Sequence, residues 1–161
     1  MPRFFAIITA CLLVFASTAS SQTNINLGGI AVDTAAQIEV TAESLSVDQD
    51  SGRAIFEGDV LILQDDLRIS AARVEVVYDA QTNQIARLVA TGNVTFVTAT
   101  DAAEAESADY DITTGLLTLS GDVLLTQGAS AISAQNMVVN VTDGTATMQG
   151  RVCTVLQQGG N

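Results

Sequence analysis

Apolar and polar residues alternate with a period of two along most of the chain. Every second residue is apolar or glycine over 54–62, and the same pattern returns over 88–96, 117–125 and 146–152. A period of two places each apolar set on one face of a β-strand. No segment shows a convincing helical period, so the pattern predicts an all-β fold.

Two short units recur inside this alternation and divide the chain into four internal repeats. A Gly-polar-Val unit recurs at spacings of 34, 29 and 29 residues, and an Ala-x-x-apolar unit at 29, 34 and 29. The first begins at Gly58, Gly92, Gly121 and Gly150, and the second at Ala42, Ala71, Ala105 and Ala134. One five-residue insertion within 79–87 explains the longer spacing. The chain is therefore built from repeats of about 29–34 residues.

The two units predict two kinds of bend in a strand. The glycines fall on the inward-facing parity, where the missing side chain permits a sharp bend or a close backbone. At the alanine unit the inward parity switches, from Ile69 and Ala71 to Val74 and Val76, which marks an extra residue or a corner. Turn signals such as Asp143-Gly144 join antiparallel neighbours. Four repeats of two long bent strands predict two facing antiparallel sheets, as in a jelly roll.

The ends of the chain differ from the repeats. Arg3 precedes a 12-residue apolar run over 4–15, which is too short to span a bilayer and is followed by small residues. We interpret 1–21 as a secretory signal peptide, with cleavage after Ala19 or, preferably, after Ser21. Three segments then follow: a flexible N-terminal segment over 22–36, the β-domain over 37–156, and a flexible tail over 157–161. Secretion through a cleaved signal peptide predicts a periplasmic location.

Composition narrows the possible functions. The chain has six arginines, no lysine, no histidine and 18 acidic residues, for a formal net charge of −12. This charge argues against nucleic-acid binding, which needs clustered cations. Without histidine no Ser-His arrangement exists, and the adjacent Asp65 and Asp66 read as a solvated turn. Asp48 and Asp50 fall short of a calcium ligand set, so we expect no enzyme, no cofactor and no metal.

The repeats resemble a known family. The similarity is carried by 44–48, 52–60, 67–74, 108–111 and 119–123, and extends over about 37–155. These segments look like the OstA-like family of lipopolysaccharide-transport proteins. The resemblance implies an open-ended β-jelly roll whose hydrophobic groove binds lipopolysaccharide acyl chains. It further implies a bridge that passes lipid from the inner to the outer membrane in outer-membrane assembly. Such a bridge stacks head-to-tail as a homo-oligomer and joins LptC-like inner-membrane and LptD-like outer-membrane partners.

The inward parity identifies the candidate lining of that groove. The candidates are Ile38, Val40, Phe56, Val60, Ile62, Leu88, Val94, Phe96, Leu117, Leu119, Val123 and Leu125. Inward residues of any β-sandwich also form its core, so packing and lining both stay open at each position. Phe56 and Phe96 are the strongest lining candidates, because small residues next to them leave room.

The predicted sheet has two candidate free edges, one at each end. The first strand region, 37–47, and the last, 146–156, are candidate edges with unpaired backbone groups, suited to β-augmentation. One alternative is a parallel β-helix adhesin or scaffold, with one coil for each 29-residue repeat. The other is a generic periplasmic lipid carrier, which shares the groove but does not stack.

Overall fold

The structure, a computed structural model, describes residues 23–26, 33 and 35–156. Regular structure in this part of the chain consists of strands, and none of it is a helix long and apolar enough to cross a membrane. The strands are β1 (Thr23–Asn26), β2 (Glu39–Thr41), β3 (Ser44–Asp48), β4 (Arg53–Gln64), β5 (Leu67–Tyr78), β6 (Ile85–Val97), β7 (Asp101–Asp111), β8 (Leu116–Gln127), β9 (Ser130–Asn140), β10 (Thr145–Gln149) and β11 (Cys153–Val155).

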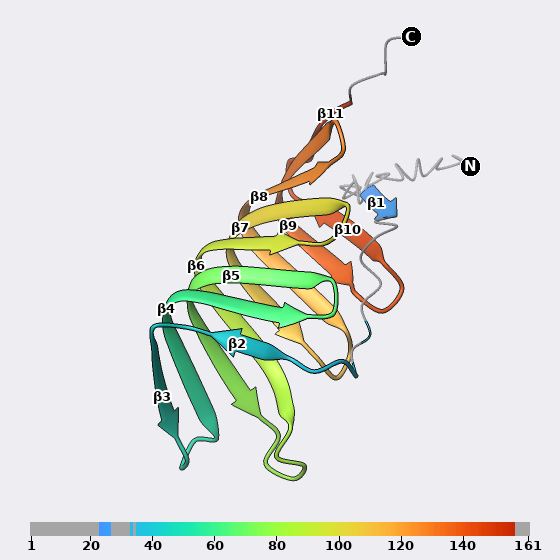
Figure 1. The fold of residues 1–161 in the computed structure, drawn as a ribbon. Helices are drawn as coiled ribbons and strands as arrows, with labels where there is room; N and C mark the ends of the chain where they lie inside the picture. The colour runs from blue at the N-terminus through green and yellow to red at the C-terminus, as the bar shows by residue number, and fades with distance from the viewer. Residues whose placement is uncertain (1–22, 27–32, 34, 157–161) are drawn as a thin grey trace, which may run out of the picture.

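All of these strands belong to one antiparallel sheet (Figure 1). Its order is β1-β10-β9-β8-β7-β6-β5-β4-β2, with β3 also paired to β4 and β11 also paired to β9. β2 and β3 pair with successive halves of β4, and β10 and β11 with successive halves of β9. Each of these pairs is thus one bent strand interrupted at its corner. Together with the six long strands β4 to β9 they give eight bent strands, so the predicted antiparallel all-β fold is confirmed.

The corners follow from the two repeated units. In β6, Gly92 (φ +82°) and Asn93 (φ +49°) occupy the left-handed region, which glycine enters without a steric cost. Ser70 pairs with Thr95, and Arg73 pairs with Thr91. Between these two pairs β5 has two residues and β6 has three, so β6 carries one additional residue. Ala71 and Val74 are both buried, which is the predicted parity switch. Equivalent register shifts lie at the same level in every pairing from β4–β5 to β8–β9.

Because these bulges are aligned, the sheet folds along one line into two layers. In Figure 1 the strand halves meet along the left-hand side and diverge to the right. Layer A contains β2, β11 and residues 60–64, 67–71, 94–97, 101–105, 123–127 and 130–134. Layer B contains β1, β3, β10 and residues 53–57, 73–78, 85–91, 107–111, 116–120 and 136–140.

Apolar side chains from both layers fill the space between them. Phe96 and Leu125 of layer A and Leu117 and Met137 of layer B are fully buried there. One polar contact crosses this interior. The hydroxyl of Tyr110 in layer B donates a hydrogen bond to Oε1 of Gln64 in layer A, at 3.1 Å. Burial raises the pKa of Tyr110.

The N-terminal segment differs from its expectation in one part. Residues 22–36 were expected to be flexible, but Thr23–Asn26 form β1, which pairs with β10. The prediction was wrong there because four residues with a single apolar side chain, Ile25, are too few to signal a strand without their distant partner. The expected signal peptide over 1–21 and the tail over 157–161 lie outside the described residues.

The corner geometry leads to a test at Gly92. A Cβ added there would lie 2.8 Å from Cβ of Ala72, whereas one added at Gly128 would meet nothing within 4 Å. Both glycines have positive φ, so each alanine carries a backbone cost of roughly 1–2 kcal/mol. We expect Gly92→Ala to lower the free energy of unfolding by more than Gly128→Ala does, as measured by urea denaturation. Adding Ala72→Gly should recover the excess, and equal losses in both single variants would contradict this account of the corner.

A second test concerns the hydrogen bond between the layers. Tyr110→Phe should lower the free energy of unfolding at neutral pH by about 1 kcal/mol, a typical net value for one hydrogen bond. Because burial raises the pKa of Tyr110 in the folded state, the native protein loses stability as the pH rises above about 10, the ordinary tyrosine value. The difference between the two proteins should therefore shrink at alkaline pH, as followed by denaturation at several pH values. Tyr78→Phe, at a half-buried ring, is the control.

Candidate functional site

The predicted lining residues all lie on the inner face, but at different depths. Nine of the twelve are at most 2% exposed, including Phe96, and pack in the core between the layers. Ile38, Val40 and Phe56 are partly buried and pack against that core from the N-terminal end. Strand parity therefore predicted the face of each side chain correctly, but it did not predict the depth.

The apolar interior continues uncovered to the N-terminal edge. Leu45 and Val47 of β3 lie opposite Phe56 and Ala54 of β4, in the inner rows of layer B. They are 54% and 62% exposed, because within the described residues β3 pairs only with β4 and its other side is not covered by a strand. These two residues were not among the predicted lining residues, although the alternation Ser-Leu-Ser-Val over 44–47 indicates that both share one face. Ala54, Phe56, Leu45 and Val47 thus form a gradient from buried core to open apolar edge, which we call the N-terminal apolar end.

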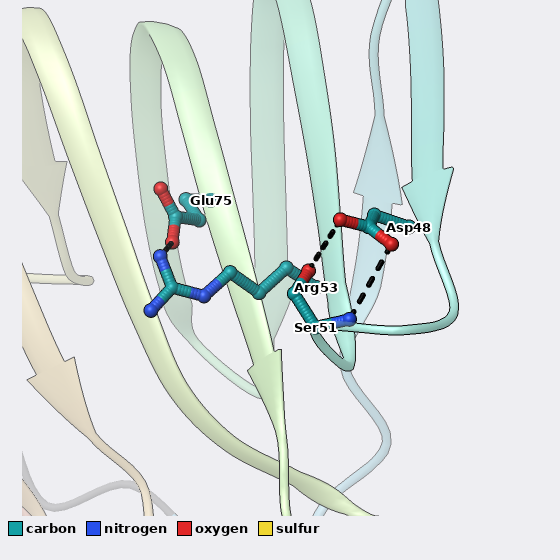
Figure 2. Close-up of polar contacts among 4 residues, drawn as sticks. All are labelled: Asp48, Ser51, Arg53 and Glu75. Carbon is teal, nitrogen blue, oxygen red and sulfur yellow. Dashed lines mark hydrogen bonds and ion pairs between the residues drawn. The ribbon is translucent and has the colours of Figure 1, made fainter.

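A rigid turn sets the position of this edge (Figure 2). The Asp48 carboxylate at the end of β3 accepts hydrogen bonds from the backbone nitrogens of Asp50 and Ser51 and from the Ser51 hydroxyl, at 2.8–3.3 Å. These bonds lower the pKa of Asp48, the Ser51 hydroxyl contributing most. Arg53, which begins β4, forms an ion pair with Glu75 at 2.7 Å. This turn joins β3 to β4 and reverses the chain within a few residues.

The opposite end of the sheet is only partly open. β11 ends layer A, and Val155 is 60% exposed there. In layer B, however, β1 pairs with β10. The expectation that 146–156 forms a free edge is therefore correct for β11 and wrong for β10, because the N-terminal segment returns to cover it.

Apart from Asp101, which begins β7 and is 3% exposed, the charges of the described residues lie outside the apolar interior. Arg53, Arg73 and Arg87 form ion pairs with Glu75, Glu57 and Asp109 on the outer face of layer B. The remaining arginines of the β-domain, Arg68 and Arg151, are exposed. No arginine of the described residues lies in the interior, so an anionic ligand meets no cation there, and the buried side chains that it would contact are mostly apolar.

Other features of the described residues suggest little chemistry. Hollows along the outside of the corners are lined by polar side chains such as Asn93, Glu104, Glu106 and Asp122, which suit water better than an apolar ligand. No group of three or more His, Cys, Asp or Glu side chains comes together within the described ranges as a metal site. Cys153 is free and exposed on β11.

Comparisons with known proteins agree with this geometry. The family model described as LptA/(LptD N-terminal domain) LPS transport protein matches residues 39–152. Among solved structures, the chain is similar to LptH, the LptA homologous periplasmic component of the conserved lipopolysaccharide transport device from Pseudomonas aeruginosa. The TM-score is 0.70, with 16% sequence identity, over 79% of this chain and 99% of that chain. At this identity the likeness concerns the fold alone.

No curated protein sequence matches the chain significantly. The family match nevertheless covers β2 to β10, and it confirms the resemblance inferred from the repeats. The chain belongs to the LptA/(LptD N-terminal domain) family of LPS transport proteins, and it is a transport component rather than an enzyme.

Proposed function

We propose that this chain is a periplasmic carrier that binds the acyl chains of lipopolysaccharide along its inner face. The observation that carries the proposal is the N-terminal apolar end, where the inner row of layer B runs out to Leu45 and Val47 without a cover. Each CH₂ group removed from water contributes about 0.8 kcal/mol. An acyl chain of about a dozen such groups therefore gains on the order of 10 kcal/mol from burial alone.

The distribution of residues suggests where the lipid begins to bind. Phe56, Ile38 and Val40 are accessible at the N-terminal end, whereas Phe96 and Leu125 are fully buried further in. We infer that an acyl chain first contacts the accessible group and then separates the two layers to reach the others. The layers can separate because each is joined to the other only along the corners and through side chains. The full set of lining residues remains the one inferred from the sequence.

A periplasmic location is supported by two observations. The sequence predicts a cleaved signal peptide over 1–21, and LptH, whose fold is similar, is described as a periplasmic component. In that compartment the chain would act as a bridge between the inner and outer membranes. We propose that β2 and β3 at one end and β11 at the other add strands of neighbouring molecules by β-augmentation. Because the two ends differ, such contacts are head-to-tail and do not close.

The bridge accounts for the proposed partners. Copies of this chain would join end to end, and LptC-like and LptD-like proteins would occupy the two ends of the stack. Of the alternatives, the parallel β-helix is wrong, because every strand pair in the described residues is antiparallel. A generic lipid carrier remains the competing function, and concentration-dependent stacking distinguishes the bridge from it.

Lipid binding at the N-terminal end is tested by three matched aspartate substitutions. Phe56→Asp should reduce lipopolysaccharide binding at least tenfold while moving the thermal midpoint by only a few degrees, because the carboxylate stays partly hydrated. Phe96→Asp should unfold the domain, since burying an unpaired charge costs several kcal/mol. Leu124→Asp, on the outer face at 39% exposed, should change neither property. Binding is measured by photo-crosslinking to purified lipopolysaccharide, and a folded Phe56→Asp variant with unchanged binding would overturn the proposed lipid position.

The salt dependence of binding is a second test. Removal of residues 1–21 takes away Arg3 and no acid, which leaves five arginines against 18 acidic residues and a formal charge of −13. Lipopolysaccharide phosphates are also anionic, so salt screens a repulsion. Affinity should stay constant or rise between about 50 mM and about 500 mM NaCl, where the screening length falls below about 10 Å. A steep fall would show instead that a basic surface holds the lipid.

A further inference from the structure

We propose that β1 is a plug strand, which occupies the β10 edge of the free molecule and is displaced by β3 of a second copy during stacking. The inference rests on the proposed head-to-tail bridge and specifies how that contact is regulated. The plug is antiparallel to β10 over four pairs, from Thr23 opposite Met148 to Asn26 opposite Thr145. The other side of β10 is occupied by β9, so β1 takes up the side that a neighbouring molecule would need.

The strand directions allow β3 of a second copy to pair with the β10 edge. Seven antiparallel steps separate β3 from β10 through β4 to β9, so the two strands run in opposite directions. β3 of a second copy placed head-to-tail would therefore meet β10 antiparallel. The same count holds in layer A, where seven steps separate β2 from β11. With β10 free, one junction continues both layers with the same antiparallel pattern that runs through the molecule.

The plug strand disturbs this match in two ways. Eight antiparallel pairings separate β3 from β1, so the two strands run in the same direction. β3 of a second copy would therefore pair with β1 in parallel, and parallel pairs are slightly less stable per residue. It also widens layer B by one strand, about 4.8 Å, without widening layer A. A second copy that met β1 in layer B would therefore be out of register with β11 in layer A. Both layers can continue together only after β1 has left β10.

Ile25 of β1 and the apolar residues of β3 can occupy the same inner-face position beside β10. Ile25 of β1 lies opposite the buried Ala146 and packs against the core. In β3, Leu45 and Val47 are the corresponding inner-face residues, and both are more than half exposed in the free molecule. The sequence of β1, Thr-Asn-Ile-Asn, has one apolar residue, whereas Ser-Leu-Ser-Val in β3 has two. Exchange would replace one apolar anchor by two and a four-residue strand by a five-residue one.

The exchange makes stacking depend on concentration in a particular way. A strand tethered to its own molecule acts at an effective concentration in the millimolar range, so it competes strongly at low protein concentration. The longer, more apolar β3 prevails when copies are abundant or are held in line by a neighbouring molecule. The plug strand therefore keeps single molecules from aggregating through an open edge, a recognised hazard of exposed strands.

A reversible disulfide tests the exchange. In a Cys153→Ser background, Ile25→Cys with Ala146→Cys places cysteines on directly paired residues, whose Cα separation of about 4.5–5.5 Å suits a disulfide. The protein is purified from the periplasm, and its mean mass is followed by light scattering across a concentration series. The oxidised form should remain a monomer at every concentration. Adding reductant should restore the association of the background protein, which also shows that the locked form was folded.

A second variant should act in the opposite direction. Ile25→Asp introduces a charge at the buried anchor of the plug, so it should lower the concentration for half-association at least tenfold. Ile25→Val, which keeps the anchor apolar, is its control. If the oxidised disulfide variant associates like its reduced form, the plug is overturned while stacking itself stands. If the background and Ile25→Asp proteins both stay monomeric at all concentrations, stacking fails as well, and the plug with it.

Discussion

The structure depends on one backbone constraint, the alignment of the corners at which each strand bends. At each corner one strand carries an additional residue and two successive residues with positive φ, such as Gly121 at +84° and Asp122 at +43°. The neighbouring strand carries a short Ala-x-x step that keeps both flanking side chains inside. A single misaligned corner would place the inner side chains of one layer on the outer face. Because the repeats keep the corners in line, one sheet becomes two facing layers with a common interior.

The same geometry explains why most charges of the described residues are separated from the apolar interior. Each bent strand contributes one inner and one outer face to both layers, and acidic residues such as Asp59, Glu57 and Glu106 are exposed on the outside, whereas Asp101 at the start of β7 is buried. The three ion pairs between β4, β5, β6 and β7 lie on the outer face of layer B. Pairs this exposed contribute about 0–1 kcal/mol each, so they matter less for stability than for keeping arginine out of the interior. A strongly acidic chain can in this way carry an anionic lipid by its apolar part alone.

Much of this fold was predictable from the sequence, because its signals are local and repeated. The period of two assigned Phe56, Phe96 and Leu125 to the inner face, and the glycine unit at Gly92 located a corner that the backbone confirms. Depth was not predictable, because Phe56 and Phe96 share one parity and each has a neighbouring strand on both sides, but β4 lies one strand from the end of its layer and β6 lies in the middle of the sheet. β1 was missed for a related reason. Its partner β10 lies about 120 residues away in the chain, and four residues carry too little pattern to indicate that pairing.

The uniform corners also make the molecule a short solenoid, in which each bent strand of the described residues pairs only with its immediate neighbours. Stability in such an array is approximately a sum of unit terms and nearest-neighbour terms, so it is lowest where a neighbour is missing. β3 is such a terminal unit, with exposed Leu45 and Val47 and, in the part of the chain that the structure describes, no strand beyond it. Fraying should therefore begin at the N-terminal end and spread inward strand by strand. A molecule inside a stack has no such end, so the bridge would be thermally more robust than any of its single members.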